Sequence, residues 1–184
     1  MLLPGHGLPI VGGDRIRQSF EDAATLLESL HDQTVNMMNA GARLDEIVNA
    51  IEYPADLLEK PYLRPVYDEP EFVVRNVWRL YGGWYDGDPA NLKPAPAGAL
   101  AREVASLAGG VDPLVARARA AIDAGDLRLA GHLAEWAALA APHDADVHRA
   151  RAEVNEARAA AEASTMSKGV FSWAAAESRR RIED

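Results

Sequence analysis

The chain of 184 residues is long enough for one domain or two small ones, and with 48% hydrophobic residues it can bury a real core. Its formal net charge of −9 argues against nucleic acid and against anionic membrane surfaces as partners, because both recruit basic patches. It contains no cysteine, which excludes disulfides and thiolate metal sites and leaves the redox compartment open.

The first 13 residues, MLLPGHGLPIVGG, form a loop punctuated by glycine and proline, in which neither a helical nor a strand period is complete. They lack the charged region and apolar core of a signal peptide, and no apolar run in the chain approaches the ~20 residues of a membrane span. We therefore expect no membrane association and, by default, a cytoplasmic location, although the sequence does not specify the compartment. Taken alone, the one histidine of this loop, His6, is typical of a solvated side chain.

Residues 14–40 predict a long helix that begins at Asp14 and ends at Gly41. Its seam positions alternate steps of four and three, as in a heptad repeat: Ile16, Phe20, Ala23, Leu27, Leu30, Thr34 and Met37. Such a seam is typical of packing between subunits, and it is equally typical of an ordinary amphipathic helix that packs on the core of its own domain. A short helix at 44–51 and a proline-rich connector at 53–69, with one helical turn at Leu57 and Leu58, are predicted next.

Residues 72–92, FVVRNVWRLYGGWYDGDPANL, are the densest apolar and aromatic run in the chain. Two adjacent rows at helical spacing cover more than half of the girth of the predicted helix: Val74, Trp78, Tyr81 and Tyr85, and Val73, Val77, Leu80 and Trp84. Such a helix is predicted to be buried on several sides, at the centre of a helical domain. The glycine pair 82–83 indicates a close approach of another backbone or of a ligand beside Tyr81, and residues 86–89 should end the helix.

Residues 98–110 contain a helix rich in alanine and leucine, and alanine dominates from Asp112 onward. Helices are predicted at 113–124, 127–141 and 144–164, and the sharp turns between them predict antiparallel hairpins. This part resembles a tetratricopeptide repeat, with small residues and a proline at the repeat's spacing: Leu114, Ala130, Ala137 and Pro142, and with Ala118 and Ala121 in place of the usual Gly and Tyr. A solenoid needs about three repeats, so we expect this pair to pack on the rest of the domain.

The predicted fold is therefore all-α, a bundle of about eight helices with tetratricopeptide-like hairpins, since no segment alternates as a strand does. The four histidines other than His6 do not form a metal motif. His143 and His148 flank two aspartates, which are better explained as a helix start, with Asp144 as the N-cap. The arginines of the last segment, SRRRIED, are typical of a solvated helix end.

Beyond these patterns, RLYGGWYDGDPANL, with LRPVYDEPEFVVRNVW before it, resembles the dimerisation region of the alkyl sulfatases of the metallo-β-lactamase superfamily. In that family a helix ends in a motif close to Tyr-x-Gly-Trp-Tyr/Phe-Asp-Gly-Asn-Pro, from which this chain departs at Asp88. The loop from Leu3 to Gly12 resembles the superfamily loop that carries the last metal-ligand histidine. The resemblance implies that His6 corresponds to a metal ligand. It also implies that Tyr81 corresponds to a tyrosine that helps to hold the sulfate group of the substrate; the alternative is a core aromatic whose hydroxyl bonds a neighbouring backbone carbonyl.

The resemblance also implies that a catalytic core precedes this region in the family, with an HxHxDH motif and zinc. The motif is absent here, so we expect no cofactor in this chain. Residues 1–13 are expected to be the end of the metallo-β-lactamase domain and residues 14–184 the helical dimerisation domain. The chain is then either a natural remnant or the product of a start codon placed inside a larger gene. Alone it is expected to be inactive, because His6 cannot hold two metals by itself.

Two functions remain open. The favoured one is a helical dimerisation domain of an alkyl-sulfatase-like protein, with a second copy as its partner and a separate metallo-β-lactamase-type chain as the source of any catalytic core. The alternative is a free-standing tetratricopeptide-like adaptor that binds a peptide or another protein. Self-association separates them, because only the first function requires a homodimer.

Overall fold

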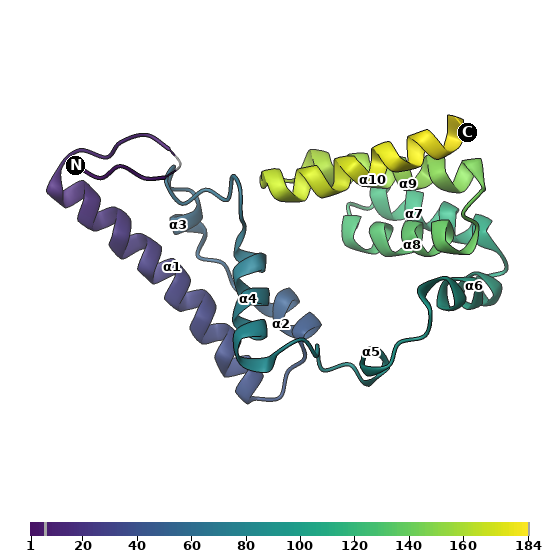
Figure 1. The fold of residues 1–184 in the computed structure, drawn as a ribbon, viewed down its shortest axis with the longest axis horizontal. Coiled ribbons are helices and arrows are strands. Elements are labelled where there is room, and N and C mark those ends of the chain that lie inside the picture. The colour runs from purple at the N-terminus through teal and green to yellow at the C-terminus, as the bar shows by residue number, and fades with distance from the viewer. Residues whose placement is uncertain (6, 184) are drawn as a thin grey trace. The chain divides into compact units, whose positions relative to one another are not determined.

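A computed structural model of the protein describes residues 1–5 and 7–183, which form ten helices and no strand (Figure 1). The sheet-like pairing among these residues is a single bridge between Leu2 and Ile10, whose backbones exchange two hydrogen bonds of 2.9 Å. The predicted all-α class is confirmed. The helices belong to two compact units, residues 1–92 and residues 93–184. None of the helices in the described part of the chain is long and apolar enough to cross a bilayer.

The first unit is built around one long helix. α1 (Gly13–Asn39) packs against α4 (Pro70–Gly82) and α2 (Leu44–Ala50), as Figure 1 shows. The short α3 (Ala55–Leu58) lies in the proline-rich connector, and α5 (Pro89–Leu92) ends the unit. The helices predicted at 14–40 and 44–51 are therefore confirmed, as is the helical turn in the connector.

The core of the first unit lies where its three main helices meet. Leu30 of α1, Ile47 of α2 and Val74 of α4 are each at most 1% exposed. Full burial of one such side chain contributes about 1.5–3 kcal/mol, so these three residues anchor the unit. Thr34 is also buried, and its hydroxyl donates to the carbonyl of Leu30 at 2.7 Å, so its burial leaves no unpaired hydroxyl.

The heptad-like seam of α1 divides between core and surface. Leu30 and Thr34, in the second half of the helix, are buried. Phe20 and Leu27, which lie nearer the start of the helix, are 58% and 50% exposed. The later part of the seam therefore packs in the core of the first unit, and the earlier part presents apolar side chains to solvent.

The helix predicted at the centre of the domain is shorter and less buried than expected. α4 ends at Gly82, and Gly83 follows with a φ of 78°, a left-handed value that favours glycine. The buried face of α4 consists of Val74, Val77 and Trp78. Of the other residues in the predicted rows, Val73 and Tyr85 are partly buried, whereas Leu80, Tyr81 and Trp84 are 73%, 61% and 75% exposed. The prediction of burial on several sides is wrong, because only one face of α4 is covered within the unit.

The second unit is a stack of helices joined by short turns. Each helix packs against its neighbours in the chain: α6 (Ala97–Ala108), α7 (Val111–Asp123), α8 (Leu127–Ala140), α9 (Ala145–Ala161) and α10 (Thr165–Glu183). Alanine allows the close approach, since Ala118, Ala130 and Ala137 are 0% exposed. The helices and hairpins predicted between residues 98 and 164 are confirmed.

Side-chain caps fix the turns of the second unit. The carboxylate of Asp126 accepts a hydrogen bond from the backbone N–H of Leu129 at 3.1 Å. The carboxylate of Asp144 accepts from the N–H groups of Asp146 and Val147 at 2.9 and 3.1 Å. The prediction of Asp144 as an N-cap is confirmed, and a cap of this kind stabilises a helix by about 1 kcal/mol.

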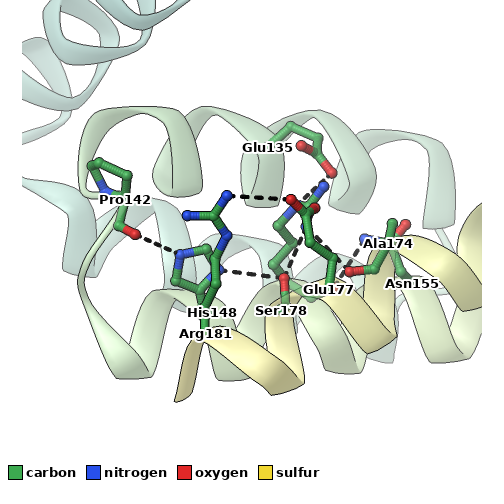
Figure 2. A network of polar contacts seen from close by, with 9 residues as sticks. Glu135, Pro142, His148, Asn155, Ala174, Glu177, Ser178 and Arg181 are labelled. Atoms are coloured by element: carbon green, nitrogen blue, oxygen red, sulfur yellow. Dashed lines mark hydrogen bonds and ion pairs between the residues drawn. The ribbon is translucent and has the colours of Figure 1, made fainter. Parts of the chain in front are cut away.

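A largely buried arginine, with 11% of its side chain exposed, joins α9 to both neighbouring helices. Arg151 donates from Nε to Glu135 of α8 at 2.8 Å, and from one terminal nitrogen to Glu177 at 3.0 Å and to the Ser178 hydroxyl at 2.9 Å on α10. Figure 2 shows the side chains of Glu135, Glu177 and Ser178 with their hydrogen bonds as dashed lines. Burial alone would raise the pKa of Glu177, but the hydrogen bonds from Arg151 and Arg181 outweigh it and lower this pKa. The network therefore holds α10 onto α9.

Candidate functional site

Tyr81 lies at the surface, on the last turn of α4. Its side chain is 61% exposed, and its ring meets that of His31, on α1, edge to face with centroids 5.7 Å apart. The Tyr81 hydroxyl is 3.0 Å from Nε2 of His31. The group that the resemblance assigns to sulfate is thus accessible to solvent, and a histidine 50 residues away in the sequence holds it from one side.

His31 is in turn held by its neighbour. Its Nδ1 lies 2.8 Å from a carboxylate oxygen of Asp32, and the two side chains are 41% and 73% exposed. A carboxylate at neutral pH only accepts hydrogen bonds, so Nδ1 must carry a proton in this contact. Asp32, His31 and Tyr81 therefore form one hydrogen-bonded chain that ends at the exposed hydroxyl. No sequence pattern links residues 31 and 81, and the sequence gives no signal for this pairing.

The segment after Tyr81 is a structural turn. The carboxylate of Asp86 accepts from the backbone N–H of Asp88 at 2.9 Å and from the side-chain amide of Asn91 at 2.6 Å, and these bonds lower its pKa. The carbonyl of Asp86 accepts from the N–H of Leu44 at 3.0 Å, at the start of α2. The indole N–H of Trp78 donates to the carbonyl of Tyr85 at 3.0 Å. The turn thus locks the end of α4 onto α2.

The departure at Asp88 leaves this turn intact. Its carboxylate accepts from the N–H of Ala90 at 2.9 Å, at the start of α5. The side-chain oxygen of Asn is an equally good acceptor at a helix start. Both residues can therefore perform this task.

The close approaches expected beside Tyr81 come from side chains. A Cβ added to Gly82 would lie 3.1 Å from the terminal methyl of Met38 and 3.4 Å from the Trp78 ring. At Gly83 nothing lies within 4 Å, and its left-handed φ explains the glycine. At Gly87, which also has a left-handed φ, a Cβ would lie 3.0 Å from the Arg43 side chain. The glycines thus serve packing and backbone conformation around the turn.

The metal ligand implied by the resemblance, His6, lies outside the described residues. Among the residues that are described, no three His, Asp or Glu side chains converge as a metal site requires. His148, which lies close to two aspartates in the sequence, is buried and contacts the carbonyl of Pro142 at 2.9 Å and the Ser178 hydroxyl at 3.3 Å (Figure 2). The donor set in the described part of the chain does not fit the zinc centre of the resembled family.

The first unit also carries an apolar surface. A shallow groove between α1 and the connector is lined by residues that include Leu27, Val66 and Tyr67, which are 50%, 63% and 68% exposed. Phe20 on α1, and Leu80 and Trp84 at the end of α4, add further exposed apolar side chains. Exposed apolar residues of this size are typical of an interaction surface, and the second unit exposes some as well, among them Leu107, Val170 and Trp173.

Three comparisons relate the chain to known proteins. The family model described as alkyl sulfatase dimerisation matches residues 43–181. An (R)-specific secondary-alkylsulfatase of Pseudomonas sp. is 34% identical over 157 residues, which are 85% of this chain and 24% of that protein. The alkyl/aryl-sulfatase BDS1 of Saccharomyces cerevisiae is 30% identical over 151 residues, which are 82% of this chain and 23% of that protein.

The fold agrees with these matches. The solved structure of the stereoselective inverting sec-alkylsulfatase Pisa1 from Pseudomonas sp. superposes with a TM-score of 0.87 at 31% identity, over 96% of this chain and 28% of that one. The chain therefore spans about a quarter of the length of the relatives that it matches.

Proposed function

The chain belongs to the alkyl sulfatase dimerisation family, and we propose that it is a helical dimerisation module that also presents Tyr81 to the sulfate group of an alkyl sulfate ester. The observation that carries the proposal is the exposed end of α4. There an accessible tyrosine and two large exposed apolar side chains, Leu80 and Trp84, lie within one short stretch. An interaction surface and a ligand-facing hydroxyl can thus be positioned by the same helix.

Dimerisation is supported by the apolar surface of the first unit. The exposed residues are large, and a second copy of the chain supplies the same surface, as a two-fold interface requires. Burial of such side chains between copies stabilises the pair by roughly 25 cal/mol per Å² of apolar area removed from water. Obligate dimer interfaces are apolar in the same way.

The sulfate role is supported by the chemistry and the exposure of Tyr81. A phenol O–H can donate to a sulfate oxygen while its ring packs in an interface. Its neighbour His31 adds a cation whenever it is protonated, and a cation favours a sulfate ester, which is an anion. The chemistry of ester cleavage itself would come from a metal core outside this chain.

Sedimentation equilibrium at micromolar concentration tests the dimerisation proposal, and we expect a homodimer. A monomer at tens of micromolar would contradict it. The purified chain is also expected to show no metal-dependent hydrolysis of a long-chain alkyl sulfate, and turnover would contradict its role as a non-catalytic module. Replacement of the tyrosine that matches Tyr81 in a full-length relative tests the sulfate role, since phenylalanine there should cause a clear loss of hydrolysis.

The alternative function is a tetratricopeptide-like adaptor. One observation favours it: residues 93–183 form a compact unit of stacked helical hairpins by themselves. Under this alternative the chain stays monomeric and recovers one distinct protein partner in a pull-down. The sedimentation result therefore separates the two functions.

A further inference from the structure

We propose that His31 is the positioning residue of Tyr81, and that the pair accepts a tetrahedral sulfur oxyanion only when His31 carries a second proton. The proposal rests on the sulfate-binding role proposed for Tyr81 above. It adds a requirement that this role does not contain: binding of the anion is coupled to uptake of one proton at a named nitrogen.

When His31 is neutral, the hydroxyl proton of Tyr81 points to His31 and not to solvent. Nδ1 of His31 donates to Asp32 at 2.8 Å, so in a neutral imidazole Nε2 has no hydrogen and can only accept. The group 3.0 Å from Nε2 is the Tyr81 hydroxyl, which must then donate its single proton to His31. What it presents to solvent is an oxygen with lone pairs. Lone pairs repel the oxygens of an anion, so the neutral pair does not bind sulfate.

Protonation of Nε2 reverses this hydrogen bond. The Nε2–H group of the imidazolium donates to the Tyr81 oxygen across the same 3.0 Å. The hydroxyl proton of Tyr81 is released and can point outward to a sulfate oxygen. The positive charge also lies one hydrogen bond behind the hydroxyl, and both changes favour an anion. No atom has to move far, because only protons change position.

The surroundings of His31 permit this change. On α1, Asp32 contacts Nδ1 and Glu28 lies one turn earlier, so the charged groups of this helix near His31 are carboxylates. On α4 the titratable group in contact is the Tyr81 hydroxyl. Next to α2, the backbone of Glu52 pairs with Gln33, which lies on another face of α1 because residues two apart on a helix do not face each other. His31 is also partly exposed, so water can deliver the proton.

The first experiment reads the proton arrangement without any ligand. The full chain, labelled with ¹⁵N in histidine, is titrated by NMR. We expect the neutral form of His31 to keep its proton on Nδ1, and this preference to weaken in Asp32→Asn. A neutral His31 with its proton on Nε2 would overturn the proposal, because Tyr81 would then already be free to donate.

The second experiment measures anion binding against pH. Methyl sulfate, a minimal sulfate ester, is added at constant ionic strength with chloride as the reference, while the signals of His31 and of the exposed His132 and His143 are followed. Above the titration range of His31 we expect the affinity to fall about tenfold per pH unit, since one proton is bound with each anion. The response should be confined to His31. An affinity independent of pH would overturn the proposal.

Variants separate positioning from simple charge attraction. Tyr81→Phe should abolish the response of His31 to methyl sulfate, whereas a retained response would mean that the anion binds the imidazolium directly. His31→Gln keeps a side-chain amide that can donate to Tyr81 at every pH, so binding should persist and lose its pH dependence. His31→Leu should lose binding. Equal binding by the Gln and Leu variants would contradict the assignment.

Failure of this proposal differs from failure of the sulfate role. If methyl sulfate affects Tyr81 at no pH, the sulfate role fails and the proposal with it. If methyl sulfate binds at Tyr81 and its affinity depends neither on pH nor on the residue at position 31, the sulfate role stands and the proposal alone fails. A parallel titration with inorganic sulfate identifies the source of the anion. If inorganic sulfate alone gives a pH-dependent response of His31, the pair is a site for the product. If methyl sulfate gives this response, the pair is a site for the ester.

Discussion

Nζ of Lys60 lies 2.6 Å from a carboxylate oxygen of Asp22, and the Tyr62 hydroxyl donates to the same oxygen at 2.5 Å. Asp22 is buried on α1, whereas Lys60 and Tyr62 belong to the connector that follows α3. Gln18, one turn earlier on α1, donates to the second oxygen at 2.9 Å. Two donors, Lys60 and Tyr62, therefore fix the proline-rich connector to α1, and Gln18 supports the carboxylate from within the helix.

This contact should make the first unit sensitive to acid. The hydrogen bonds from Lys60 and Tyr62 lower the pKa of Asp22 from 3.8 to about 2. Because the folded pKa is depressed, the stabilisation is fully present above pH 3.8 and is lost as the pH falls from 3.8 towards 2. Unfolding of the first unit, followed by hydrogen exchange, should show a steep loss of stability in this window.

Asp22→Asn should be less stable at neutral pH and should lose stability less steeply below pH 3.8, by the contribution of one proton. Tyr62→Phe keeps the carboxylate and removes one donor, so the pKa of Asp22 should rise and the acid transition should move to higher pH. An unchanged acid profile in both variants would contradict the assignment of the window to Asp22.

Removal of the buried guanidinium in the second unit should loosen α10. Arg151→Met takes away the donor to Glu135, Glu177 and Ser178, and the loss of one partner of a buried ion pair typically costs about 3–5 kcal/mol. We expect about 2 kcal/mol, because the two glutamates keep contact with water. Arg180→Met, on the exposed side of α10, is the control and should change stability little. Hydrogen exchange of α10 in urea measures both, and equal effects would contradict the network's role.

Two glycines should respond in opposite directions to the same substitution. Gly169 lies on the exposed side of α10 with nothing within 4 Å of an added Cβ, so Gly169→Ala should stabilise the helix by about 0.5–1 kcal/mol. Gly125 has a φ of 77° in the turn before α8, so Gly125→Ala should destabilise by about 1–2 kcal/mol although space is also open there. Thermal unfolding of both variants is the measurement. A shift of the same sign in both would mean that backbone conformation does not govern these positions.

The limits of prediction from the sequence follow from the range of the signals. α1 and the hairpins could be predicted because caps such as Asp144 and apolar periodicity act within a few residues. α10 was missed apart from its charged end, because its buried face is made of small residues, Ser167, Ala174, Ala175 and Ser178, which give almost no periodic signal. Local patterns thus predict a helix where a periodic apolar face or a cap marks it, and α10 has no such mark over most of its length.

The candidate site shows a second limit. The predicted helix end at residues 86–89 is wrong, because α4 already ends at Gly82 and the backbone leaves the helix at Gly83, within the predicted aromatic rows. The periodic pattern also could not distinguish a core position from a surface left open for a partner, so Leu80 and Val77 looked alike. The pairing of Tyr81 with His31 depends on how α4 crosses α1, and no local pattern contains that information.

The final prediction concerns the exposed end of α4. Trp84 and Leu80 are 75% and 73% exposed, so Trp84→Ser and Leu80→Ser should leave the folded chain intact. If these side chains lie at the centre of the dimer interface, each variant should weaken self-association by about 10- to 100-fold, which corresponds to about 1.4–2.8 kcal/mol. Leu107→Ser is the matched control for Leu80→Ser, since Leu107 is the same type of side chain and is 81% exposed in the second unit. Sedimentation equilibrium over a concentration series gives the dissociation constants. A weakened dimer in Leu107→Ser with normal association of the two α4 variants would move the interface to the second unit and contradict the assignment.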